Sequence, residues 1–158
     1  LRTGRMIGCG MVFSTATLGG LMKFVGGTWW ELQLAEGWRA HDHPECLTLT
    51  KSNDGAFQLS AATKRSGPVL QSEIEVQSRK GMPASVHSVP FSAGEFSGFC
   101  VGYGEGEHHW QRFWLACANV LVFATYNGLH EAWRSEQPSD YAMLHTLRLR
   151  QPANVLPV

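Results

Sequence analysis

Hydrophobic and polar residues alternate in several stretches of the chain, which is the pattern of a strand with one buried face. Residues 28–34 show it first, with tryptophan and leucine alternating against polar side chains. The same pattern predicts strands over residues 47–50 and 56–63. Between them, residues 52–55 include Asn, Asp and Gly, which tolerate a positive φ. We therefore expect these two strands to form a hairpin.

The second half of the chain predicts a series of longer strands, which are separated by Gly, Glu or Asn. These strands cover residues 85–90, 95–104, 109–117 and 119–126. The last of them is apolar on both faces, which is typical of a central strand that is covered on both sides. Together the four strands predict an antiparallel meander.

Two segments change to helical spacing. A proline in the first turn, followed by Leu70 and Ile74 four residues apart, predicts a helix over residues 68–79. A cap with proline at 135–138 precedes a second helical repeat, which predicts a helix over residues 136–148. The fold class that follows is α+β, a single antiparallel sheet of about six to seven strands with one inserted helix and one C-terminal helix.

We expect one domain over residues 28–149 and an irregular tail over 150–158. The segment 1–27 has three interpretations. Two arginines before the apolar run 6–22 are similar to a secretory signal, although glycine and hydroxyl residues dilute the run and no Ala-x-Ala site follows it. The alternatives are a fragment or misplaced upstream start, and an ordinary extra strand.

Composition narrows the classes of partner. The 158 residues are 44% hydrophobic, enough to bury a core without a metal or disulfide. Thirteen basic and thirteen acidic residues cancel, so we expect no nucleic acid partner, and the apolar runs are too diluted to predict a membrane span. The four cysteines lack CxxC spacing, and we expect no cofactor. A cytoplasmic location is expected, with a secreted or periplasmic one as the alternative.

The histidines give one candidate metal site. His41 and His43 lie two apart on an extended segment, so their imidazoles face the same way and could share a zinc or copper ion, with Glu45 on the same side. His108 and His109 could complete the site if their hairpin tip folds near the first loop. Both patches lie in predicted polar loops, where solvated histidines are ordinary surface residues.

Tryptophan gives a candidate binding surface. Trp29 and Trp30 are adjacent on one strand and point to opposite faces, so a sheet with one covered face naturally buries only one of them. Trp110, Phe113 and Trp114 likewise place aromatic rings on both faces of a strand. Because exposed aromatic residues on a sheet are typical of protein-binding surfaces, Trp29, Trp110 and Trp114 are candidate partner-binding residues. The alternative is that a helix or the N-terminal segment covers them.

Several segments carry a resemblance to a known fold. They are Trp30-Glu-Leu-Gln-Leu-Ala-Glu-Gly-Trp38, Gly55-Ala-Phe-Gln-Leu-Ser60, Arg112-Phe-Trp-Leu115, Asn119-Val-Leu-Val-Phe-Ala-Thr-Tyr126 and the closing helix ending in Thr146-Leu-Arg148. On these residues the chain resembles, over roughly residues 28–149, the α+β fold of the PsbP photosystem subunits and the yeast Ran-nucleotide-release factor family. Members of that fold serve as scaffolding subunits, adaptors and chaperones, so the resemblance implies a non-enzymatic role.

The sequence contains no Gly-x-Ser-x-Gly nucleophile motif, and the glycines of residues 102–106 lack the helix that a phosphate-binding loop requires. We therefore expect a non-catalytic, bacterial protein-binding module, such as an adaptor, effector chaperone or immunity-type protein. The alternative is a small metal-binding protein or metal-dependent enzyme that uses the loop histidines.

Overall fold

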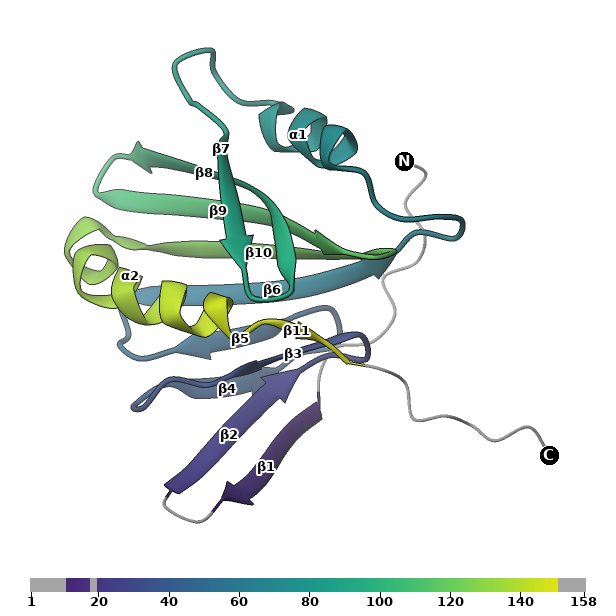
Figure 1. The fold of residues 1–158 in the computed structure, drawn as a ribbon. Coiled ribbons are helices and arrows are strands. Elements are labelled where there is room, and N and C mark those ends of the chain that lie inside the picture. Colours follow the sequence, from purple (N-terminus) through teal and green to yellow (C-terminus); the bar gives the residue numbers. More distant parts are fainter. Residues whose placement is uncertain (1–10, 18–19, 151–158) are drawn as a thin grey trace.

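The structure, a computed structural model, contains two antiparallel β-sheets that contribute to one hydrophobic core (Figure 1). It describes residues 11–17 and 20–150. In spatial order, the large sheet consists of β4 (Arg39–Asp42), β5 (Leu47–Thr50), β6 (Gly55–Thr63), β10 (Val120–Leu129), β9 (His108–Cys117), β8 (Phe96–Glu105) and β7 (Val89–Ala93). The small sheet consists of β1 (Met11–Thr17), β2 (Gly20–Gly26), β3 (Trp30–Gln33) and β11 (Arg148–Leu149). The helices are α1 (Gln71–Arg79) and α2 (His130–His145).

Alternation along the strands gives the large sheet an inner and an outer face. On β10, Val120, Val122, Ala124 and Tyr126 are all buried, and they belong to the same core cluster as Trp30 of the small sheet. We call this side of the large sheet, which α2 and the small sheet cover, the inner face. The intervening residues of β8, β9 and β10 form the outer face.

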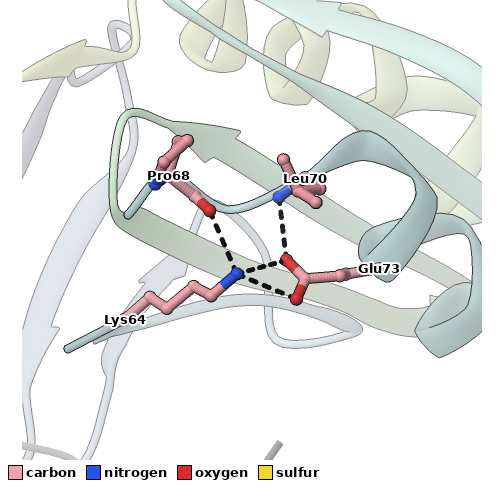
Figure 2. Close-up of polar contacts among 4 residues, drawn as sticks. All are labelled: Lys64, Pro68, Leu70 and Glu73. Carbon is pink, nitrogen blue, oxygen red and sulfur yellow. Dashed lines mark hydrogen bonds and ion pairs between the residues drawn. The ribbon is translucent and has the colours of Figure 1, made fainter. Parts of the chain in front are cut away.

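Helix α1 covers only one end of the outer face, where it lies against β8 and β9. Ile74 of the helix is buried there, as are Val101 and Ala116 of the strands. At the start of the helix, the Glu73 carboxylate accepts hydrogen bonds from the backbone N–H of Leu70 and from the Lys64 ammonium group, each at 2.9 Å (Figure 2). These contacts fix the first turn of the helix over the end of the sheet.

The predicted fold class is confirmed: the protein is α+β, with a seven-stranded antiparallel sheet, one inserted helix and one C-terminal helix. The small sheet is an addition to that prediction. The strand expected at 28–34 is present as β3, but it pairs with β2 and β11 and so belongs to the small sheet. The two sheets pack through their apolar faces, and Trp30 and Leu32 of β3 are almost fully buried.

Several predicted boundaries were wrong. The C-terminal helix begins at His130 instead of 136, and Pro138 lies inside it at an exposed position. The strand expected at 85–90 lies at Val89–Ala93. Residues 39–42, expected to be turn and loop, form the edge strand β4 because their backbone pairs with β5.

The segment predicted to precede the domain contributes a hairpin to the small sheet, β1 with β2, and Val25 of β2 is fully buried in the core. Most of the predicted irregular tail, residues 151–158, lies outside the described residues. Of the helices in the described part of the chain, neither is long and apolar enough to cross a membrane.

Candidate functional site

The outer face of the large sheet carries a group of large side chains that we call the aromatic face, which consists of Tyr103, Trp110, Arg112, Trp114 and Phe123. Strand register places them together, since Tyr103 is paired with Trp110 and Trp114 with Phe123. The Tyr103 and Trp110 rings are nearly parallel with centroids 6.4 Å apart, and the Trp114 and Phe123 centroids are 5.3 Å apart. All five side chains are partly exposed.

Arg112 lies in the middle of this face. Its guanidinium carbon is 5.4 Å from the centroid of the Tyr103 ring and 5.6 Å from that of Trp110, within the range of cation–π attraction. Its Nε–H is buried and has no hydrogen-bond partner, and no ion pair in the described part of the chain involves it. The Tyr103 and Trp110 rings therefore contact the Arg112 guanidinium group, and its Nε–H donor remains without an acceptor among the described residues.

The three tryptophans expected to bind a partner lie in different places. Trp110 and Trp114 belong to the aromatic face. Trp29 precedes β3 in the small sheet, where it is partly buried and packs against the core. Its neighbour Trp30 is buried in the core. The structure therefore does not bring Trp29 together with the other two.

A buried acid pair lies on the other side of the large sheet, on the face of α2 that packs on the core. Glu136 is 2% exposed and Asp140 is fully buried. Glu136 accepts hydrogen bonds from the hydroxyl groups of Ser52, at 2.5 Å, and Tyr126, at 2.9 Å. Both carboxyl oxygens of Asp140 are buried without a hydrogen-bond partner among the described residues. A buried carboxyl group in this state is costly, which makes the pair a candidate functional feature.

The environment of the acid pair shifts several pKa values. Burial, and secondarily the Glu136 carboxylate, raises the pKa of Asp140 to about 8. Burial also raises the pKa of Tyr126 far above its ordinary value, and the hydrogen bond to Glu136 acts in the same direction. At neutral pH, Tyr126 is therefore a hydrogen-bond donor to Glu136, and Asp140 is mostly in its neutral form.

The four histidines of the candidate metal site do not all lie together. His41, on β4, and His108, on β9, line one hollow at the end of the outer face. His109 is next to His108 on the strand and points to the inner face, where it stacks on Trp133 with centroids 4.6 Å apart. Burial lowers the pKa of His109. His43 is exposed, just beyond the end of β4.

Among residues 11–17 and 20–150, no group of three or more His, Cys, Asp or Glu side chains is placed to hold a metal ion. His41 instead forms a hydrogen bond with the Thr50 hydroxyl, at 3.2 Å. A joint metal site built on these histidines stays a prediction, which a zinc titration followed by native mass spectrometry would test.

Sequence reasoning missed Arg112, Glu136 and Asp140 as site residues. A signal was present for the acid pair: Glu136 and Asp140 lie three and seven residues after Trp133, in phase with the buried Leu144 and Leu147. Acidic residues in phase with an apolar stripe are unusual enough to indicate a buried polar cluster. Arg112 could have been predicted as a site residue because alternation places it on the same face of the strand as Trp110 and Trp114, between them.

The architecture assigns the protein to the α+β fold class, with two antiparallel sheets and two helices around a common core. A solved structure of a protein from Bacteroides thetaiotaomicron VPI-5482 is similar, with a TM-score of 0.57 and 15% sequence identity. The match covers 82% of this chain and 48% of the Bacteroides chain, so this protein spans about half of that protein's length. At this identity the likeness shows the fold alone. No protein-family model and no curated protein matches the chain.

Proposed function

We propose that this protein is a non-catalytic binding module that docks a protein partner on the aromatic face. The observation that carries the proposal is Arg112, a partly buried cation that contacts two aromatic rings and has no acidic partner among the described residues. Arginine and tryptophan are the residue types that most often dominate binding energy at protein interfaces. Their combination in the centre of a sheet face is typical of a binding hot spot.

The chemistry of the face defines the partner. A carboxylate can accept hydrogen bonds from the Arg112 guanidinium, whose planar donors suit that group better than a lysine would. The rings of Trp110 and Trp114 offer apolar area on either side of it along β9. We therefore expect the partner to present an Asp or Glu side chain between apolar residues.

The resemblance to the PsbP and Ran-nucleotide-release factor fold is consistent with such a role and is itself a proposal. Within that fold, proteins that serve as adaptors or chaperones hold a partner without transforming it. Under this proposal the protein is an adaptor, effector chaperone or immunity-type protein of a bacterium.

The test is cross-linking followed by binding measurements. A photo-cross-linking residue at Thr125, which pairs with Arg112 across β9 and β10, would be used to trap and identify the partner in cells. The purified partner would then be titrated against Arg112→Gln and Trp110→Ala. We expect each variant to weaken binding by at least about tenfold, because each removes a central anchor.

Arg134→Gln is the matched control, since Arg134 is exposed on α2 and lies away from the outer face. It should bind the partner as tightly as the wild type does. The proposal is wrong if Arg112→Gln and Trp110→Ala bind like this control while circular dichroism shows that they are folded.

A further inference from the structure

The hollow at the end of the outer face has the size of a small-molecule site. Its volume is about 510 Å³, and it lies where β4, β5, β6, β9 and β10 come together beside the loop between β5 and β6. Pockets for small ligands span about 300 to 1,000 Å³. It is distinct from the aromatic face, although Asn127 in its lining is paired with Trp110 across β10 and β9.

Hydrogen bonds connect one wall of the hollow to the interior of the protein. Ser52 and Gly55 line the hollow, and the Ser52 hydroxyl donates to the buried Glu136 carboxylate of α2. The Asp54 carbonyl accepts the backbone N–H of Leu129, which ties the same loop to the end of β10. A nearly fully buried carboxylate thus holds a surface loop in place.

Two glycines leave room for the hydrogen bonds between the loop and Glu136. Gly55 and Gly128 are paired across β6 and β10. A Cβ at Gly55 would lie 2.7 Å from the Glu136 carboxylate, and a Cβ at Gly128 would lie 2.7 Å from the Tyr126 hydroxyl. Both positions therefore need glycine so that Tyr126, Glu136 and Ser52 can form their hydrogen bonds. The wall of the hollow is preorganised by these contacts, which favours binding because less order is lost when a ligand enters.

The lining selects the chemistry of the ligand. Its side chains are mostly neutral groups that donate and accept hydrogen bonds, among them His41, Thr50, His108 and Asn127. Among the described residues that line it there is no lysine or arginine to balance an anion, and Asp54 would repel one. Ala56 is the one apolar side chain among these lining residues, so an apolar ligand would find little to pack against. A neutral molecule rich in hydroxyl groups fits this set.

We propose that the hollow binds a neutral sugar, which forms hydrogen bonds with His41 and Asn127. Both side chains can donate and accept, as successive sugar hydroxyls require. Glu136 acts as a positioning residue because it reaches the ligand only through Ser52.

The full chain would be screened by saturation-transfer NMR against a panel of neutral mono- and disaccharides, which includes glucose, galactose, mannose and N-acetylglucosamine. For a sugar that binds, calorimetry would compare the wild type with Asn127→Ala and His41→Ala. We expect each substitution to weaken binding by about tenfold or more, as the loss of a central hydrogen bond does. His87→Ala, at another exposed histidine, is the matched control and should bind normally.

Ser52 gives a separate test of the anchored wall. Ser52→Ala should weaken sugar binding, and Ser52→Thr, which keeps the hydroxyl, should restore it. Trp114→Ala should leave sugar binding unchanged while it weakens docking of the protein partner, so the two proposals fail independently. The sugar proposal is overturned if no sugar of the panel shows saturation transfer, if binding survives both Asn127→Ala and His41→Ala, or if the hollow takes up zinc in native mass spectrometry instead.

Discussion

At the scale of single residues, the burial of Asp140 is costly. It is fully buried, both its oxygens lack a hydrogen-bond partner among the described residues, and Glu136 lies one helical turn before it. Burial raises its pKa from 3.8 to about 8, so the folded protein binds a proton that the unfolded chain releases above about pH 4. Its contribution to stability is therefore greatest below pH 4 and is lost as the pH rises to about 8.

The prediction concerns Asp140→Asn, which cannot ionise. The free energy of unfolding of the wild type should fall by up to about 1.4 kcal/mol per pH unit between pH 4 and pH 8, relative to the variant. At pH 7 the variant should be more stable than the wild type by roughly 1 to 3 kcal/mol, because the residual cost of burying an amide offsets part of the gain. Urea unfolding across this pH range measures both quantities.

Asp54→Asn is the control, since Asp54 is exposed in the loop between β5 and β6. It should not reproduce the gain in stability that we expect for Asp140→Asn at pH 7. Parallel pH profiles for the wild type and Asp140→Asn would show that Asp140 is ionised in the folded protein, contrary to the prediction.

At the scale of elements, α1 depends on one carboxylate at its start. Glu73 accepts the backbone N–H of Leu70 and pairs with Lys64 (Figure 2). The hydrogen bond from Leu70, and then the contact with Lys64, lowers the pKa of Glu73, so its stabilising effect is present above about pH 4.5 and is lost as the pH falls through its lowered pKa. Leu70 itself has no side chain that could cap the helix.

We predict that Glu73→Gln increases hydrogen exchange in the first turn of α1 at pH 7. Glu75→Gln is the matched control, because Glu75 pairs with Arg79 at an exposed position within the same helix and should have a smaller effect. Mass spectrometry of peptides that cover residues 68–79 measures both. Equal exchange in the two variants would mean that the cap does not determine the stability of the first turn.

Most elements could be predicted because their signal is local. The alternation in β9 follows directly from one face being buried. The prediction that residues 119–126 are covered on both faces was wrong, because every second residue of β10 is only partly buried. The start of α2 could not be predicted, since its N-cap, Leu129, makes no side-chain hydrogen bond. Instead the backbone N–H of His130 bonds the carbonyl of Glu107, a contact between distant parts of the chain.

The candidate site could be predicted only in part, because contacts between distant parts of the chain form it. Glu136 and Asp140 were not singled out from the sequence, because acidic residues are rarely buried. What buries them is the long-range packing of α2 on the large sheet, where Tyr126 and Ser52 supply hydroxyl donors to Glu136. The same applies to the hollow, since the sequence indicated its histidines but not which two of them share a surface.

At the scale of the whole molecule, the two sheets share a core and should unfold together. Leu32 and Trp30 of the small sheet are almost fully buried, in one cluster with Phe57, Phe113 and Tyr126 of the large sheet. A core divided between two sheets in this way couples their stability, because neither sheet keeps its apolar face covered when the other unfolds.

Leu32→Ala tests this coupling. The substitution should lower the free energy of unfolding by about 2 to 5 kcal/mol, because it leaves a cavity where a fully buried side chain was removed. If the sheets unfold together, the slowest-exchanging amides of β9 and β10 should lose the same protection as those of β3, although Leu32 lies on neither strand. Leu70→Ala is the control, since that leucine is 51% exposed and its loss should change stability by less than about 0.5 kcal/mol. Amides of β9 and β10 that kept wild-type protection in Leu32→Ala would show instead that the large sheet is stable without the small one.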